Sequence, residues 1–181
     1  MKFDQYNISE EIKKNLAELG FRRPTDIQFK AIPSIIKGED VLAIAQTGTG
    51  KTAAFAIPLV NQIHRAKKSR RSKGIKCLVL VPTRELAAQI GDVFRFLSKH
   101  TRVKTFALHG GVEQDPQIRK LEDGLDVLIA TPGRMFDLIS QGYVHLDEVV
   151  TLILDEADHM LDLGFIDDIK AAIVTAHPAQ R

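Results

Sequence analysis

The sequence predicts an α/β fold in which helices flank both faces of a parallel sheet. Short apolar runs rich in β-branched residues recur along the 181 residues, and segments whose apolar residues have helical spacing separate them. Parallel strands covered on both faces read as nearly continuous apolar runs, which is the form of the runs here. The expected strands are residues 41–45, 77–81, 103–108, 127–130 and 151–154.

Helices are expected between these strands and near both ends of the chain. Their apolar residues recur three and four positions apart, which gathers them on one face of a helix. The expected helices are residues 9–19, 25–37, 53–66, 84–99, 113–123, 133–141 and 165–176. At this length the chain is expected to fold as one domain, residues 1–181.

The composition is that of a globular protein, with 44% hydrophobic and 27% charged residues. The first 20 residues alternate charged and apolar positions, so we expect neither a signal peptide nor a membrane span. A cytoplasmic, monomeric domain without a membrane partner is the resulting prediction. Cys77 is the one cysteine, and its place in an apolar run predicts a buried, inert thiol.

The net charge of +2 says little about partners, because domains that bind nucleic acid through bulk electrostatics are more basic. One basic cluster lies between residues 65 and 73. We interpret it first as a solvated loop and, alternatively, as a patch for an anionic partner.

The most specific motif is a glycine-rich turn that follows an apolar run and precedes a helix-forming segment. In such a turn, backbone N–H groups curl around phosphate oxygens, and the helix N-terminus adds partial positive charge. Lys51 is expected to reach the β- and γ-phosphates of a triphosphate, and Thr52 to place its hydroxyl on Mg²⁺. Ala45 stands where a first glycine is usual, and an ordinary glycine-rich loop is the alternative. The expected nucleotide ligands are Gln46, Thr47, Gly48, Thr49, Gly50, Lys51 and Thr52.

Polar or glycine-rich clusters follow every expected strand. After the phosphate loop these clusters are residues 82–86, 109–111, 131–134 and 155–158. Ligands of open α/β sheets bind beyond the carboxyl ends of the strands, so all clusters are expected at one edge. Turn formation alone accounts for the glycines and prolines. It does not account for Arg84, Arg134, Asp155 and Glu156 at the same edge.

Two carboxylates at the end of the last expected strand suggest hydrolysis. Asp155 is placed to hold Mg²⁺ opposite Thr52, and Glu156 is placed to orient or deprotonate a water that attacks the γ-phosphate. The alternative is that both residues cap the helix that follows. Asp158 fits either interpretation.

The base of the nucleotide is partly predictable. The Asn-Lys-x-Asp pattern that reads guanine in many GTPases does not occur in this chain. Gln28 lies upstream of the phosphate loop, and a side-chain amide can donate to and accept from adenine at once. Taken alone, a glutamine such as Gln28 would more often be a surface residue.

Together these segments resemble the motifs of DEAD-box RNA helicases, in the order of that family. Residues 20–28 are similar to the Q motif, 45–52 to motif I, 82–86 to motif Ia, 110–111 to the GG doublet, 131–134 to motif Ib and 155–158 to motif II. The resemblance runs from Phe3 to the end of the chain. It divides the chain into a Q-motif region, residues 1–40, and a core, residues 41–181.

The resemblance implies a RecA-like domain that binds ATP and Mg²⁺. Gln28 would read adenine, with Phe3 packing on the ring. Lys51, Asp155 and Glu156 would carry catalysis, with Thr52 and Asp155 at the metal and Glu156 as the base. Single-stranded RNA would face Pro82, Thr83, Arg84, Gly110, Gly111, Thr131, Gly133 and Arg134. Arginines pair with phosphates and glycines admit a close sugar–phosphate chain, so binding should be largely independent of base sequence.

The chain ends at Arg181, where the family would continue into a strand with a Ser-Ala-Thr motif and a second RecA-like domain. The resemblance therefore implies the N-terminal half of an ATP-dependent RNA helicase. The full-length protein would couple ATP hydrolysis to duplex unwinding, with the C-terminal RecA-like domain as a partner. Two other functions stay open: a small-molecule kinase, and a nucleotide-dependent RNA-binding module without turnover.

Overall fold

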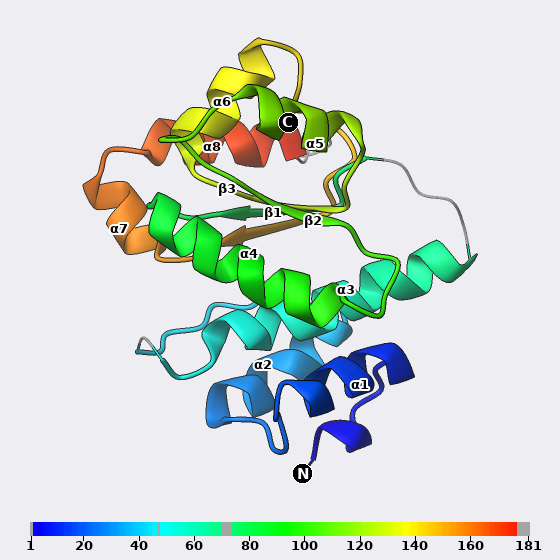
Figure 1. The fold of residues 1–181 in the computed structure, drawn as a ribbon. Helices are drawn as coiled ribbons and strands as arrows, with labels where there is room; N and C mark the ends of the chain where they lie inside the picture. The colour runs from blue at the N-terminus through cyan, green and yellow to red at the C-terminus, as the bar shows by residue number, and fades with distance from the viewer. Residues whose placement is uncertain (1, 47, 70–73, 177–181) are drawn as a thin grey trace. The chain divides into compact units, whose positions relative to one another are not determined.

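The computed structural model describes residues 2–46, 48–69 and 74–176 (Figure 1). The chain divides into two compact units. The first comprises Met1–Arg71 and Asp92–Val103, and the second comprises Ser72–Gly91 and Lys104–Arg181. The boundary after residue 91 falls inside the long helix α4 (Arg84–Ser98), so this helix begins in the second unit and ends in the first.

The second unit is built on a parallel sheet. Its strands are β1 (Cys77–Leu80), β2 (Thr105–Leu108), β3 (Val127–Ala130) and β4 (Thr151–Leu154), in the order β2-β3-β1-β4. Each neighbouring pair is parallel, so all four carboxyl ends lie at one edge. The predicted strands are confirmed for these four runs.

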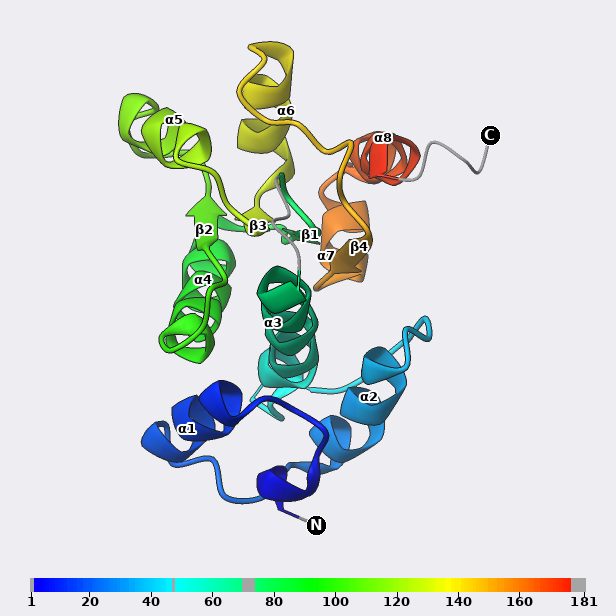
Figure 2. The same ribbon diagram turned by 90° about the vertical axis from the view of Figure 1, so that its right-hand side faces the viewer.

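Helices flank this sheet. α5 (Asp115–Glu122), α6 (Pro132–Ser140) and α8 (Ile166–Ala176) lie along one face, and the first half of α4 lies along the other (Figure 2). A Cβ atom on Gly91 would lie 2.7 Å from the Cβ of Ala107, so the lack of a side chain lets α4 approach β2 closely. The predicted α/β fold class is therefore confirmed.

The core of the second unit fills the space between the sheet and its helices. Leu78 of β1 and Leu128 of β3 are opposite each other in register, and both are fully buried. They belong to one apolar cluster with Met135 and Leu138 of α6. Burial of each leucine contributes about 1.5–3 kcal/mol. This packing fixes the strand ends from which the polar clusters extend.

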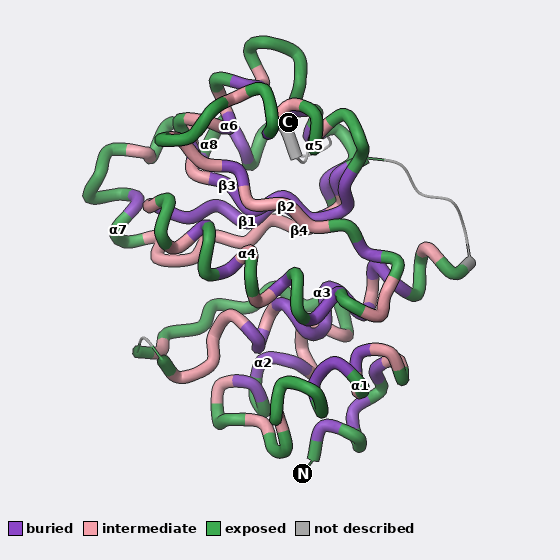
Figure 3. Tube along the Cα trace, in the orientation of Figure 1, coloured by how far each residue is buried: buried purple, intermediate pink, exposed green. Residues whose placement is uncertain are grey.

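The first unit is helical. It contains the short 3-10 helix η1 (Phe3–Gln5) and the helices α1 (Glu10–Glu18), α2 (Asp26–Ile36) and α3 (Lys51–Ser69), together with the second half of α4. The helices bury one side each (Figure 3). The Asn15 side-chain amide donates to the Leu97 carbonyl at 2.6 Å, which links α1 to α4.

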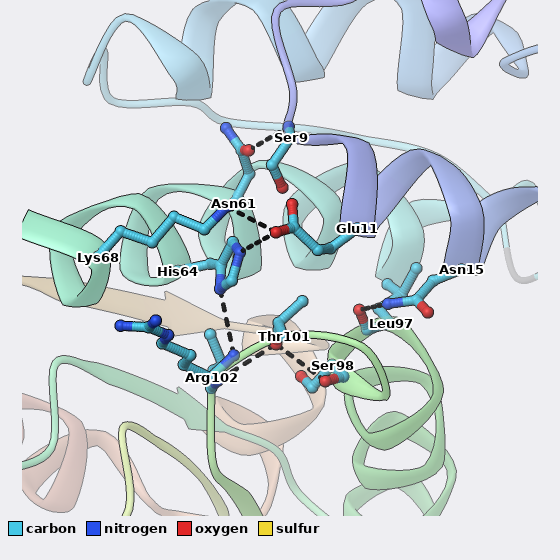
Figure 4. A network of polar contacts seen from close by, with 11 residues as sticks. Ser9, Glu11, Asn15, Asn61, His64, Lys68, Leu97, Ser98, Thr101 and Arg102 are labelled. Carbon is cyan, nitrogen blue, oxygen red and sulfur yellow. Dashed lines mark hydrogen bonds and ion pairs between the residues drawn. The ribbon is translucent and has the colours of Figure 1, made fainter.

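A polar network connects α1, α3 and the segment after α4 within this unit (Figure 4). His64 is buried; its Nδ1 accepts the Arg102 backbone N–H at 3.1 Å, and its Nε2 lies 3.4 Å from a Glu11 carboxylate oxygen. Lys68 donates to the same carboxylate. This hydrogen bond from Lys68 is the main reason why the pKa of Glu11 falls to about 2.

Residues 41–45 differ from the prediction, because they form no strand. Leu42 is 91% exposed and Ile44 is 92% exposed. A strand needs a neighbour that takes its N–H and C=O groups, and no strand of the described residues pairs with this run. The prediction of a first strand at 41–45 is therefore wrong for this structure.

Smaller differences concern the basic cluster and the segment after β4. Residues 65–69 continue α3, so this part of the cluster is helical rather than a loop, and residues 70–73 lie outside the described residues. A short helix, α7 (Ala157–Asp162), precedes α8 and includes Asp158. The predicted helix at 165–176 corresponds to α8, whereas α7 was not among the predicted helices.

Cys77 is buried in β1, and this burial raises the pKa of its thiol to about 12, as expected for an inert thiol. Among the helices of the described residues, none combines the length and the apolar character that crossing a bilayer requires.

Candidate functional site

The glycine-rich loop stands directly before α3 in the first unit. Gly48 and Gly50 have φ values of +82° and +90°, which glycine adopts without strain. The Thr49 hydroxyl donates to the Gln46 carbonyl at 2.8 Å and closes the loop on itself. Thr47 lies outside the described residues.

α3 begins at Lys51, so Lys51 and Thr52 occupy its first turn. Unpaired N–H groups and the helix dipole make this end of a helix favourable for anions. Both side chains are half-buried. The loop therefore presents a cation, a hydroxyl and a helix N-terminus together, which is the set expected for a phosphate ligand.

Gln28 is buried against this loop. The side chain is 2% exposed, its Oε1 accepts the Thr25 N–H at 3.0 Å, and its Nε2 donates to the Gly50 carbonyl at 3.1 Å. A Cβ atom on Gly50 would lie 2.5 Å from that Nε2. Gln28 thus joins the start of α2 to the phosphate loop, and the surface-residue alternative is wrong.

A cavity of about 620 Å³ lies next to the loop, within the first unit. Its walls are the start of α2, the run 41–45 and the loop residues Gly48 and Thr49. The cavity is large enough for a nucleotide-sized ligand. Gln28 does not line it, because its amide is directed inward to Gly50.

Phe3 is a core residue with 4% exposure. Its ring packs on Tyr6 and Phe21, both at 6.0 Å between centroids. Burial of this aromatic ring is favourable, and a base packed on Phe3 stays a prediction. Phe3 does border a cavity of about 470 Å³, together with Phe21 and Arg23.

Phe21 and Arg23 were missed as candidate site residues. The sequence signal existed, since both lie in the 20–28 segment and combine an aromatic ring with an arginine two positions apart. Only the fold shows that they line a cavity.

The carboxyl edge of the sheet in the second unit brings three predicted RNA contacts together. Gly111 has φ +79°, and a Cβ atom on it would lie 2.7 Å from Nη1 of Arg84. Arg134 donates through Nη2 to the Val112 carbonyl at 3.3 Å. Arg84 and Arg134 thus both lie beside one glycine loop. Two guanidinium groups beside exposed backbone N–H groups form a surface suited to a phosphate chain.

Within the described residues, the Arg84 side chain is paired with its neighbour Glu85. Its Nε donates to Glu85 at 2.8 Å, which raises the pKa of Arg84 and lowers that of Glu85. Both side chains are exposed, and an exposed pair of this kind is weak. A phosphate can therefore compete for Arg84.

The remaining predicted RNA contacts follow the same strand ends but differ in exposure. Pro82 is buried, and its contact with RNA stays a prediction. Thr83 stands directly before α4, and its hydroxyl accepts the Leu86 N–H at 3.3 Å. Gly110 and Thr131 are half-buried, and Gly133 is exposed.

The two carboxylates follow β4 at the same edge. Asp155 accepts the Glu156 N–H at 3.1 Å through Oδ1. Glu156 has φ +54° and ψ +48°, and it is the one non-glycine with positive φ among the described residues. A left-handed glutamate costs about 1–3 kcal/mol, and such strain gathers at functional positions. Its carboxylate lies 3.4 Å from His159 Nδ1.

The phosphate loop belongs to the first unit, whereas Asp155 and Glu156 belong to the second. One site formed by Lys51, Thr52, Asp155 and Glu156 stays a prediction. Within residues 2–46, 48–69 and 74–176, no group of three or more histidine, cysteine and acidic side chains could hold a metal by itself.

Comparison with known proteins places this geometry in a family. The family model described as DEAD/DEAH box helicase matches residues 25–181. The chain therefore belongs to the DEAD/DEAH box helicase family, which confirms the resemblance of its motifs.

The chain is 44% identical over 168 residues to the DEAD-box ATP-dependent RNA helicase RhpA of Helicobacter pylori, covering 93% of this chain and 33% of that relative. It is 42% identical over 180 residues to the ATP-dependent RNA helicase CshA of Listeria monocytogenes, covering 99% of this chain and 34% of that relative. This chain thus spans about a third of the length of the curated relatives that it matches.

A solved structure agrees with this relationship. The crystal structure of a hypothetical ATP-dependent RNA helicase from Sulfolobus tokodaii superposes with a TM-score of 0.83 at 38% identity, covering 93% of this chain and 47% of that chain. The RecA-like fold predicted from the motifs is therefore confirmed.

Proposed function

We propose that this chain is the ATP-binding and RNA-binding part of an ATP-dependent RNA helicase. The observation that carries the proposal is the carboxyl edge of the sheet, where Arg84 and Arg134 lie at the loop 109–112 and where two carboxylates follow β4. No core packing requires these charges at one edge. A family member with such an edge is expected to bind a polyanion there.

The nucleotide part of the proposal rests on the first unit. Lys51 and Thr52 stand at the start of α3, and two left-handed glycines precede them. We assign the triphosphate to this loop and adenine to the region of Gln28. In the structure both ends of the Gln28 amide are bonded within the chain, so reading adenine would require Gln28 to exchange one of these bonds.

Mg²⁺ fits the oxygen donors of Thr52 and Asp155, because this ion prefers hydroxyl and carboxylate ligands. When bound, it would neutralise charge on the phosphates. Glu156 is the proposed base that takes a proton from the attacking water. Its left-handed backbone supports this role, since strain at a carboxylate needs a reason other than packing.

Unwinding and rapid hydrolysis are proposed for a longer polypeptide. The relatives are about three times as long as this chain, and the resemblance assigns the arginine fingers to a second RecA-like domain. An arginine finger increases the rate by roughly 10³–10⁵. Unwinding also needs two bodies whose closure ATP favours. Residues 1–181 alone should therefore bind both ligands but turn over slowly.

The test measures ATPase activity of residues 1–181 with and without RNA, and again after the C-terminal half of a relative is supplied. We expect slow turnover alone and faster, RNA-dependent turnover with the added half. Rapid RNA-stimulated hydrolysis by residues 1–181 would show that this part carries its own finger.

The second candidate function is an RNA-binding module that responds to nucleotide without hydrolysing it. It would be preferred if ATP and RNA bound as expected and the added half produced no turnover. The cytoplasmic location, the monomeric state and the single domain also stay predictions.

A further inference from the structure

Gln117 is a buried polar side chain that no motif of the chain explains. It lies on α5 in the second unit and is 5% exposed. A buried amide costs free energy unless its donors and acceptors are paired, so its partners decide why it is there.

Those partners belong to two of the predicted RNA-contact segments. Gln117 Nε2 donates to the His109 carbonyl at 3.1 Å, and its Oε1 accepts Nη1 of Arg134 at 2.6 Å. A carbonyl needs a donor and a guanidinium needs an acceptor, so only one orientation of the amide satisfies both. The amide therefore ties the loop after β2 to the helix after β3.

Arg134 bonds both to Gln117 and to the loop, so the three are joined in a ring of hydrogen bonds. It donates to Gln117 through Nη1 and to the Val112 carbonyl through Nη2, so loop and guanidinium are held at two points. These bonds use two of the five N–H donors of the guanidinium, which leaves others for a phosphate. An arginine fixed in this way loses less side-chain entropy when a phosphate binds.

We infer that Gln117 is a positioning residue, which holds Arg134 and the loop 109–112 at a fixed spacing for neighbouring phosphates of a single RNA strand. This inference rests on the proposed RNA-binding function. Gln117 itself is too buried to touch the RNA, so its effect must pass through Arg134 and the loop.

The test replaces Gln117 by methionine, which keeps the length of the side chain and removes its polar ends. The matched control is Gln114→Leu, because Gln114 also stands at the start of α5 but bonds to Gln141 at 2.8 Å, away from the loop. Binding of a labelled oligouridylate to residues 1–181 is measured by anisotropy at several salt concentrations.

We expect Gln117→Met to weaken RNA binding about tenfold, because small misplacements of a positioned group are costly. The slope of log affinity against log salt should become shallower by about 0.7, the value for one lost phosphate contact on a single strand. Gln114→Leu should leave both unchanged. Weaker binding with an unchanged slope would overturn the inference, since it would indicate a merely structural role.

Arg134 variants separate the possible failures. Gln117→Met should cause no further loss in an Arg134→Ala background, and additive losses would overturn the positioning role. Arg134→Lys keeps the charge but cannot bond to both Gln117 and the Val112 carbonyl, so this variant should also bind RNA weakly. The Arg134→Lys variant leaves the buried position 117 unchanged, so it still tests the inference if Gln117→Met fails to fold. The positioning role would also be overturned if Arg134→Lys bound RNA as tightly as the unmodified chain. If Arg134→Ala itself leaves affinity and slope unchanged, the proposed RNA surface is wrong.

Discussion

Two glycine loops of this protein are each hydrogen-bonded by a buried glutamine, but the two glutamines differ in the groups to which their amides bond. Gln28 gives both ends of its amide to the main chain, at Thr25 and Gly50. Gln117 gives one end to the main chain of His109 and the other to the charged side chain of Arg134. The first arrangement fixes the shape of a loop. The second fixes the position of a charge beside a loop.

The difference suggests how each site responds to change. A loop whose shape is fixed by main-chain bonds should lose stability and ligand together when it is altered. When a charge held beside a loop is displaced, ligand binding should weaken while the fold stays stable.

Alanine substitution at Gly50 and at Gly111 should give the largest difference between the two loops, measured as the loss in the free energy of unfolding. Gly50→Ala places a Cβ atom 2.5 Å from the buried Gln28 amide at φ +90°, so we expect a loss of about 2–4 kcal/mol in the free energy of unfolding. Gly111→Ala meets the exposed end of Arg84, which can move, so about 1–2 kcal/mol is expected. Urea unfolding of both variants measures this. Equal losses would remove the contrast.

Lys51→Ala should weaken nucleotide binding by about 1.5–3 kcal/mol, the usual value of a hydrogen bond to a charged group. RNA affinity should not change, because Lys51 belongs to the first loop. Glu156→Gln should keep ATP bound and impair only hydrolysis, since a base acts on water and not on the ground-state complex. Calorimetry with ATP compares the variants. The role of Glu156 is wrong if its variant loses ATP as severely as Lys51→Ala.

Gln28→Ala should weaken ADP binding by about 1–3 kcal/mol and pyrophosphate binding by less. The physical reason is that adenine would lose its hydrogen-bond partner when the Gln28 amide is removed, which leaves polar groups of the base unpaired. The control is GDP, which the unmodified chain should bind less well than ADP. Equal affinity for ADP and GDP would refute adenine recognition by Gln28, and its role would be limited to the loop.

The smallest effect is expected on the stability of the fold at acidic pH. Hydrogen bonds from Lys68 to Glu11 and from Lys99 to Glu18 lower the pKa of both carboxyls from an ordinary 4.5 to about 2. Their stabilising effect is complete above pH 4.5 and is lost as the pH falls toward 2. Both groups lie in the first unit and near the surface, so the effect is modest.

Urea midpoints between these pH values should therefore fall less steeply in a Glu11→Gln, Glu18→Gln variant than in the unmodified chain. Helix signals of α1 should be lost first. An identical pH dependence of the two proteins would show that these pairs do not stabilise the fold.

Most of the fold was predictable because burial left a local pattern. The runs at 77–81, 127–130 and 151–154 are apolar at every or nearly every position, which is typical of strands covered on both faces. The run at 41–45 has the same pattern and yet forms no strand, because pairing depends on a partner rather than on the run itself.

The candidate site was predictable where a motif existed. The order of the glycines, Lys51 and the acidic pair located the loop and the strand ends. Three features carried no such signal: the burial of Phe3 under Phe21, the left-handed backbone of Glu156 and the two bonds of Gln117. Each depends on residues that are brought together only by the fold.

The burial of Cys77 in β1 also makes this protein convenient for dye attachment. Maleimides react with the thiolate, and a buried thiol with a pKa of about 12 supplies almost none at neutral pH. No native cysteine needs to be removed, because Cys77 is the only one in the chain. A cysteine introduced at an exposed position, such as Lys120→Cys on α5, would therefore carry a fluorophore at one defined place.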